Sequence, residues 1–458
     1  MSNSRKIGNN VYLPDENPPL PKLLIFAIQQ VLVMFPPTAT VALITGFPVS
    51  TTIFSCGLAT ICFIMITRGQ VPLFFGSSFA YLSAIIGIII AQGYESGSGI
   101  LPVEAVRVAQ FGIMMSGLVS VAAGLIAKAL GPQSIQKLLP AHITGSISIV
   151  IGLSLAGNAL TDITDSSQFH NLSWTVAMLT FLSTVLFAVY CKGIPAQAPL
   201  LLGALIGCSA TALILWLSGG EQNLFRSISN EVFANSLWKL GDGSAVSLPP
   251  FSLPKVSLEA ALAIMPIAFA TIPESVAHIY QLDIYVNELA RESGSSKRFS
   301  IKEKLADTLI GDGCSDIICG IIGAPAGTSY GENMSAMMIS KVFSTSVLVV
   351  ASILLIFLSC VTPLVKIIYG IPLAVIGGLE IYLFGAIAIQ GVAVMIQSKC
   401  DVFSNRRMAV IASILVIGIG GTYAFDGSIP FFGMDIPAIA GASVFGILLN
   451  WLLGFKES

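Results

Sequence analysis

Apolar residues dominate the chain from Leu24 to Leu453, in long runs that are separated by short polar or turn-rich breaks. A run of about 20 apolar residues is long enough to cross the hydrocarbon core of a bilayer as a helix. The runs form two sets of seven, and we predict spans at 23–45, 49–67, 71–92, 108–130, 139–158, 173–191, 198–218, 258–280, 304–323, 326–345, 346–368, 371–395, 408–423 and 436–454. The predicted fold class is an all-α polytopic membrane protein with 14 transmembrane spans.

The distribution of basic residues among the predicted loops sets the orientation. With the N-terminus in the cytoplasm, 17 of the 22 Lys and Arg residues fall on the cytoplasmic side. The other 5 fall outside, and they are Arg107, Arg226, Lys239, Lys255 and Lys366. Cytoplasmic loops carry an excess of Lys and Arg, so this bias supports both the span count and the orientation. We therefore predict a multi-pass protein of the cell inner membrane with both termini in the cytoplasm.

An odd number of spans in each half means that the second half enters the membrane upside down relative to the first. This is the inverted-repeat plan of many secondary transporters. One sequence match supports it: Pro140 to Gly145 opens the fifth span and Pro372 to Gly377 opens the twelfth, and both read Pro-x4-Gly. We predict a 7+7 inverted repeat, with a cytoplasmic N-terminal segment at 1–22 and an extracytoplasmic linker at 219–257.

The third span of each half contains an interrupted pattern. The segments Val71–Tyr81 and Ala324–Asn333 both begin with a β-compatible stretch and pass through small residues before a helical run. Extended backbone at membrane depth is tolerated only where it is buried in protein or lines a cavity. We predict short β-strands in spans 3 and 10, followed by half-helices whose N-termini direct N–H groups at a carbonyl-bearing or anionic ligand. The alternative is two ordinary helices with glycine packing faces.

Four acidic residues of the predicted spans are candidate functional groups, because an ionisable side chain near the bilayer centre costs about 2.5–3.5 kcal/mol. They are Glu274, Asp312, Glu332 and Glu380. His278 follows Glu274 by four residues, so the two side chains share one face of a helix. We predict that these residues surround a mid-membrane site.

Each candidate also has a structural interpretation. His278 is either a ligand group or a packing residue near a helix end, and Glu332 also complements the positive end of a helix. Asp312 either handles protons or hydrogen-bonds the backbone at a break. Glu380 is either a gate residue or faces a water-filled vestibule.

The coupling ion follows from the same residues. Desolvation disfavours the charged form of a buried carboxyl group, so two carboxyls and a histidine suit proton symport. A sodium site typically offers several carbonyl and hydroxyl oxygens, and Thr328, Ser329 and Ser77 keep that alternative open.

Composition narrows the remaining classes. The chain is 55% hydrophobic and 10% charged, against about 25% charged residues in an average soluble domain. Its net charge of −2 predicts no nucleic-acid partner. The eight cysteines show no CxxC spacing, so we expect neither a metal site nor another cofactor.

At these residues the chain resembles the nucleobase/ascorbate transporter family, whose bacterial members include uracil and xanthine permeases. The most specific match is the run from Glu332 to Lys341, in which Ser335 and Ser340 stand where the family has Gly and Thr. The matching motifs nearby are Gly76–Phe79, Glu274 with His278, Gly311–Gly313 and Thr328–Gly331. The chain departs from the family pattern at Gln29–Gln30, Pro36–Pro37 and Ser275–Ala277.

The resemblance implies a dimer whose protomers have a core domain, spans 1–4 and 8–11 at 23–135 and 258–368, and a gate domain, spans 5–7 and 12–14 at 136–218 and 369–455. It implies that Glu274 and Glu332 accept ring N–H groups, that the backbone of Phe79 and Gly331 lines the site, and that His278 contributes through a hydrogen bond or water. Ser78 and Asn333, in the matched motifs, are further candidates.

The leading hypothesis is a proton-coupled nucleobase symporter that imports uracil, or xanthine, by alternating access. Glu rather than Gln at position 332 favours uracil, since Gln is common among the xanthine and urate carriers. A sulfate-permease-like anion transporter of the same fold is the alternative. A non-transporting receptor or scaffold, and an enzyme, fit less well because we find no sizeable soluble domain and no nucleophile–base pair or metal cluster outside the carboxylate site.

Overall fold

The structure is a computed structural model, and it describes residues 11–94, 101–131, 139–164, 169–192, 194–226, 246–431 and 434–454. Parts of the predicted N-terminal segment and of the predicted linker therefore lie outside the described residues. Lys239, in the linker, is also outside them. The elements of the first half are α1 (Leu20–Thr45), α2 (Val49–Ile66), β1 (Phe75–Ser77), the 3-10 turn η1 (Phe79–Tyr81), α3 (Leu82–Ala91), α4 (Val103–Leu130), α6 (Ala141–Ser154), α7 (Ala156–Thr164), α8 (His170–Tyr190), α9 (Ile194–Gln197) and α10 (Pro199–Leu217).

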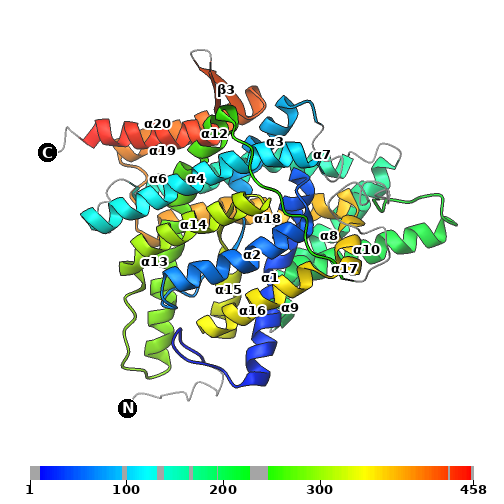
Figure 1. The fold of residues 1–458 in the computed structure, drawn as a ribbon, viewed down its shortest axis with the longest axis horizontal. Helices are drawn as coiled ribbons and strands as arrows, with labels where there is room; N and C mark the ends of the chain where they lie inside the picture. The colour runs from blue at the N-terminus through cyan, green and yellow to red at the C-terminus, as the bar shows by residue number, and fades with distance from the viewer. Residues whose placement is uncertain are drawn as a thin grey trace.

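The elements of the second half are α12 (Leu258–Ile264), η3 (Met265–Ile267), α13 (Ala268–Glu292), η4 (Ile301–Lys304), α14 (Leu305–Ile322), β2 (Gly327–Ser329), α15 (Gly331–Ser340), α16 (Thr345–Ser359), α17 (Thr362–Tyr369), α18 (Leu373–Gln397), α19 (Asn405–Ala424), β3 (Ser428–Phe431), β4 (Met434–Pro437) and α20 (Ala438–Gly454). The molecule is mostly helical (Figure 1).

Long apolar helices form most of the molecule. Within the described ranges, nine helices are long and apolar enough to cross a membrane. Eight helices, α1, α2, α8, α10, α14, α18, α19 and α20, agree with predicted spans to within three residues at each end. Other predicted spans consist of shorter pieces, such as β1, η1 and α3 in the third and β2 with α15 in the tenth.

The helices pack in two groups. In the first helix group, α4 and α2 flank α14, α16 packs on α2, and α1 and α12 join them. In the second helix group, α18 packs against α6, α7 and α8, while α10 lies on α8 and α19 lies on α20 and α6. In Figure 1, α4, α14, α2 and α16 run as neighbouring, roughly parallel rows, and α19 and α20 lie together at the upper left.

Glycine pairs allow close helix contacts in both groups. A Cβ atom added at Gly117 of α4 would lie 2.6 Å from the Gly313 carbonyl oxygen of α14. In the second group, a Cβ atom at Gly145 of α6 would lie 2.6 Å from the Gly391 carbonyl oxygen of α18. Small residues at such crossings bring two backbones together, which is a main source of helix association in lipid.

Two buried strands lie between these helices. Strand β1 pairs antiparallel with β2, with Phe75 opposite Ser329 and Ser77 opposite Gly327. Each strand supplies the hydrogen-bond partners that the other's extended backbone needs, because no water is available at membrane depth. A Cβ atom at Gly76 would collide with the Tyr330 ring, so the pairing needs glycine there. The strands lead into the half-helices α3 and α15.

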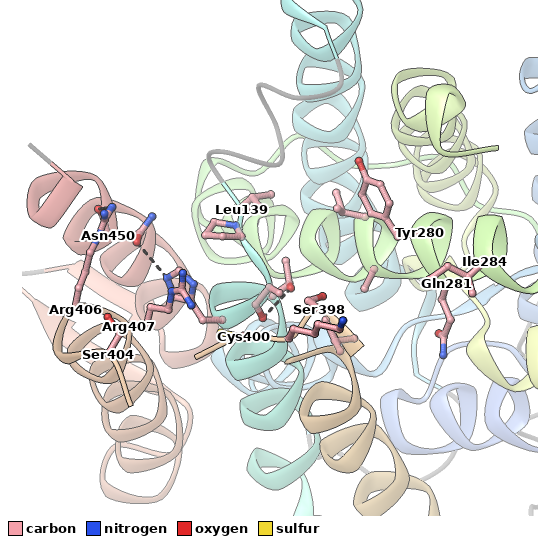
Figure 2. A pocket seen from close by; sticks show the side chains of 18 residues that line it. Leu139, Tyr280, Gln281, Ile284, Ser398, Cys400, Ser404, Arg406, Arg407 and Asn450 are labelled. Carbon is pink, nitrogen blue, oxygen red and sulfur yellow. Dashed lines mark hydrogen bonds between the residues drawn. The ribbon is translucent and has the colours of Figure 1, made fainter. Parts of the chain in front are cut away.

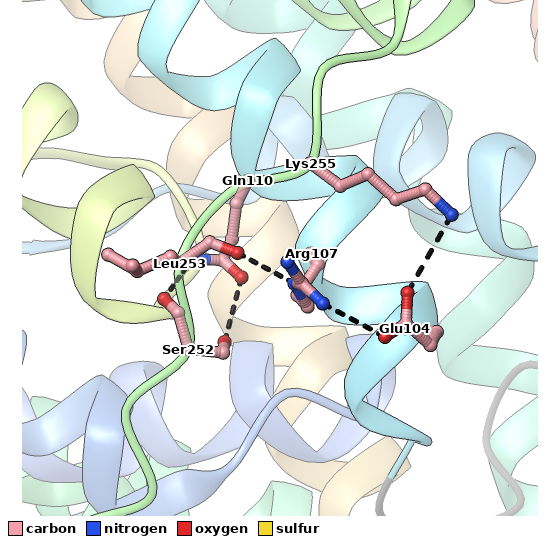
Figure 3. Close-up of polar contacts among 6 residues, drawn as sticks. All are labelled: Glu104, Arg107, Gln110, Ser252, Leu253 and Lys255. Atoms are coloured by element: carbon pink, nitrogen blue, oxygen red, sulfur yellow. Dashed lines mark hydrogen bonds and ion pairs between the residues drawn. The ribbon is translucent and has the colours of Figure 1, made fainter.

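The described end of the linker is attached to α4. Figure 3 shows Arg107 Nε donating to the Leu253 carbonyl oxygen at 2.9 Å. Gln110 Nε2 donates to the Ser252 carbonyl oxygen at 2.7 Å, and the Ser252 hydroxyl donates back to Gln110 Oε1 at 2.8 Å. These contacts hold the chain against the first helix group before α12 begins.

Two features differ from the sequence prediction. The predicted span at 436–454 begins with part of a β3–β4 hairpin, with Ser428 opposite Pro437, and the helix α20 starts only at Ala438. The predicted span at 346–368 is divided into α16 and α17, where Thr362 and Pro363 begin a new helix. Pro363 suits this start because the first turn of a helix needs no backbone N–H from it.

Candidate functional site

The site begins where the two half-helices follow the paired strands. Helix α15 starts at Gly331, immediately after β2, and Glu332 lies in its first turn, where the positive end of the helix dipole favours a carboxylate. On the other side, Ser78 follows β1, and its hydroxyl accepts a hydrogen bond from the Ala80 N–H at 3.3 Å. Phe79, which is 6% exposed, opens η1 directly after it.

Glu274 and His278 approach this point from α13. Pro273 lies inside that helix, one residue before Glu274. The Glu274 side chain lies beside Thr328 of β2 and within electrostatic range of Glu332 and Asp312. The structure therefore brings together three of the four acidic residues that the sequence singles out.

His278 is buried, and both of its ring nitrogens have partners. Nδ1 is 3.0 Å from the Ser329 hydroxyl oxygen on β2. Nε2 is 3.1 Å from the Gln390 amide nitrogen on α18. With the amide nitrogen assigned to this position, Nε2 accepts, and a neutral ring carries its proton on Nδ1 and donates to Ser329.

Gly331 lies at the centre of these contacts. A Cβ atom added there would lie 2.9 Å from Gln390 Nε2 and 3.1 Å from His278 Nε2. Real Cβ atoms seldom have contacts this short, so a larger residue would displace one of these side chains. Glycine at this position allows α13, α15 and α18 to meet at the start of the half-helix.

Helix α18 lines the opposite wall of the site. The Phe79 and Phe384 rings pack edge to face, with centroids 5.4 Å apart and planes at 77°. Aromatic pairs of this geometry contribute about 0.5–1.5 kcal/mol beyond the area that they bury. The Tyr382 hydroxyl, from the same helix, lies within electrostatic range of Glu332.

Asn333 and Asp312 support the site from behind. Asn333 is fully buried, and its amide donates to the Gln30 backbone oxygen at 3.0 Å and to Gln30 Oε1 at 2.8 Å. It therefore joins α15 to α1. Asp312 on α14 is buried beside Ser275, and neither carboxyl oxygen has a hydrogen-bond partner among the described residues.

Glu380 has different surroundings. Its side chain is fully buried on α18, and its charged neighbour is Asp162 of α7. The preceding glycines, Gly377 and Gly378, approach Ala159 and Ala177 of α7 and α8. Glu380 thus belongs to the packing of the second helix group, whereas the other three acidic residues surround the half-helix.

A cavity of about 720 Å³ adjoins the site helix. Val276, Ala277 and Tyr280 of α13 form one wall, and residues of α6, α18, α19 and α20 form the rest. Figure 2 shows Tyr280 and Gln281 on one side and Arg406, Arg407 and Asn450 on the other. His142 Nε2 lies 3.1 Å from Asn450 Oδ1 on that far side. The cavity therefore lies between α13 and the second helix group, which α13 also contacts through α6 and α20.

Comparison with known proteins identifies the class. The model of the Permease family matches residues 21–427, so this chain belongs to that family, the nucleobase/ascorbate transporters. The chain is 29% identical to the putative pyrimidine permease RutG of Escherichia coli over 99% of this chain and 94% of that protein. It is 30% identical to the uracil permease of Bacillus caldolyticus over 96% of this chain and 93% of that protein.

A solved structure shares the fold. The murine anion transporter Slc26a9 superposes with a TM-score of 0.65 at 11% identity, over 97% of this chain and 69% of that one. At this identity the likeness concerns the fold alone. Family membership and the apolar helices together make the chain a multi-pass membrane protein.

Sequence reasoning missed the contribution of α18. The search for buried charge passes over Phe384, Tyr382 and Gln390 because none of them is charged at neutral pH. The sequence does offer a signal for Gln390, because a polar amide inside a long apolar run is unusual. Gln30 was noted only as a departure from the family pattern, and its contact with Asn333 depends on the fold.

Proposed function

We propose that this protein is a proton-coupled nucleobase symporter that imports uracil across the cell inner membrane by alternating access. The observation that carries the proposal is the meeting of Glu274 and Glu332 at the N-terminal end of half-helix α15. Carboxylates accept hydrogen bonds, and a helix N-terminus donates them. Uracil offers two N–H donors and two carbonyl acceptors, which complement both.

Each site residue has a role in this proposal. Glu274 and Glu332 accept the ring N–H groups, and the backbone near Phe79 and Gly331 receives the carbonyl oxygens. Phe79 also offers an aromatic ring against which a flat base packs. His278 contributes a hydrogen bond, and Ser78 holds the turn that precedes Phe79.

The names of the relatives support uracil over xanthine. The relatives at 29–30% identity are named as uracil or pyrimidine permeases. Glu332 also favours uracil, since Gln is common at the matching position among xanthine and urate carriers. Helix α18 adds a shape constraint through Phe384, which narrows the space in front of Phe79.

The carboxyl cluster supports proton coupling. Asp312 and Glu332 both lie within electrostatic range of Glu274, and His278 is on the same helix face as Glu274. Three charged carboxylates inside a bilayer are expensive, and a bound proton lowers that cost. We infer that a proton binds to this cluster when the base binds, and that the proton and the base are both released on the cytoplasmic side.

The two helix groups support alternating access. We assign the first group to a core domain (23–135 and 258–368) and the second to a gate domain (136–218 and 369–455), in a fold of 14 spans arranged as a 7+7 inverted repeat with both termini cytoplasmic. The cavity beside Tyr280 and Gln281 is the cytoplasmic vestibule in this assignment. A homodimer would anchor the gate while the core moves.

An anion transporter with this fold is the competing function. The likeness to Slc26a9 concerns the fold, and the ligand chemistry at Glu274 and Glu332 argues against it. Two carboxylates beside the ligand repel an anion, unless both are protonated.

Ligand stabilisation separates the two functions. We expect uracil at 100 times its Kd to stabilise the purified protein by about 2.7 kcal/mol, because a ligand that binds only the folded state adds RT ln(1 + [L]/Kd). Melting temperature is measured with uracil, xanthine, sulfate and bicarbonate. Stabilisation by an anion and by neither base would refute the proposed function.

A further inference from the structure

Gln390 is an amide side chain in the apolar run of α18, where polar groups are costly unless they have partners. It is half-buried, and its amide nitrogen lies 3.1 Å from His278 Nε2. His278 lies on α13, and Gln390 lies on α18 of the second helix group.

The whole amide faces the start of the half-helix. A Cβ atom at Gly331 would lie 2.9 Å from Gln390 Nε2 and 3.3 Å from Gln390 Oε1. Both the donor and the acceptor of Gln390 therefore lie next to Gly331, one residue before Glu332. An amide presents an N–H donor beside a C=O acceptor, as does the CO–NH edge of a nucleobase, so it can hydrogen-bond that edge in either sense.

The contact also joins the two groups of helices. Helix α18 packs against α6, α7, α8 and α10 of the second helix group. His278 is tied through Ser329 to β2, which pairs with β1 and packs on α14 of the first helix group. The Gln390–His278 hydrogen bond thus connects the ligand site to the helix that faces it.

We propose that Gln390 is a positioning and specificity residue for the nucleobase: it orients the His278 ring and presents its own amide to the ligand. The inference rests on the proposed function. The surrounding acidic groups are Glu274 on α13, Glu332 on α15 and Asp312 on α14, and the Gln390 amide is a neutral polar group beside them.

The binding test replaces Gln390 by Met, which keeps the length of the side chain and removes both hydrogen-bonding atoms. We expect Gln390→Met to weaken uracil binding about tenfold in calorimetry, the usual effect of losing one hydrogen bond. The control is Gln110→Met, which removes a buried amide that bonds Ser252 and Gly320 away from the site. We expect the folded control protein to bind uracil with wild-type affinity.

A second measurement reports on His278 itself. The chain has three histidines, at 142, 170 and 278, so their ring nitrogens are separable by 15N NMR of histidine-labelled protein. We expect Gln390→Met to shift the His278 resonances and to leave those of His142 and His170 in place. Wild-type affinity in Gln390→Met, or weaker binding with unmoved His278 resonances, overturns the inference. A wild-type protein that binds no nucleobase overturns the proposed function instead.

Discussion

At the residue scale, the proposed ligand contacts depend on two carboxylates. We expect Glu274→Gln and Glu332→Ala each to weaken uracil binding at least tenfold, because a hydrogen bond to a charged group contributes about 1.5–3 kcal/mol. Binding is measured by calorimetry on purified protein. The matched control is Glu288→Gln, which removes an exposed carboxylate from the same helix as Glu274. Wild-type affinity in both site variants would show that the ligand binds elsewhere.

The sequence predicts some of the residues that form the site and not others. The four-residue spacing of Glu274 and His278 predicts a shared helix face, and both lie on α13. Their approach to Glu332 depends on where β2 and α15 lie, which no local pattern specifies. Gln390 and Phe384 reach the site only through the packing of α18, so a search for charged residues passes over them.

At the element scale, glycine contacts determine how closely α18 packs. A Cβ atom at Gly391 would collide with the Gly145 carbonyl oxygen of α6, whereas one at Gly385, on the same helix, would meet nothing within 4 Å. We expect Gly391→Ala to destabilise the protein by about 1–3 kcal/mol through overpacking. Gly385→Ala should be neutral or stabilising by up to about 1 kcal/mol, because Ala favours helix.

Thermal unfolding in detergent, followed by fluorescence or circular dichroism, measures both variants. Equal melting temperatures for Gly391→Ala and Gly385→Ala would contradict the close contact between α6 and α18.

Elements differ in how far the sequence predicts them. Helices such as α2 and α8 follow from apolar length alone, because a span needs a minimum number of apolar residues. The β3–β4 hairpin and the break between α16 and α17 do not: most of the hairpin lies between two predicted spans, and the α16–α17 break lies within an apolar run that looks continuous. Tertiary packing, rather than local hydropathy, decides where such a run stops being helical.

At the scale of the whole molecule, two helix groups meet at the half-helices, and a cavity lies between α13 and the second group. In the proposed mechanism one group moves against the other while the base and a proton stay with Glu274 and Glu332. Net movement of the base then depends on the proton gradient, since the same cluster takes up both.

Uptake of labelled uracil into proteoliposomes tests this central claim most directly. Vesicles with purified protein are compared with and without an inwardly directed proton gradient, and Glu288→Gln and Glu274→Gln proteins serve as active and inactive controls. We predict that the gradient drives uracil accumulation above the external concentration in wild-type and Glu288→Gln vesicles and not in Glu274→Gln vesicles. Uptake that is unaffected by the gradient, or absent for every nucleobase, would contradict proton-coupled nucleobase transport.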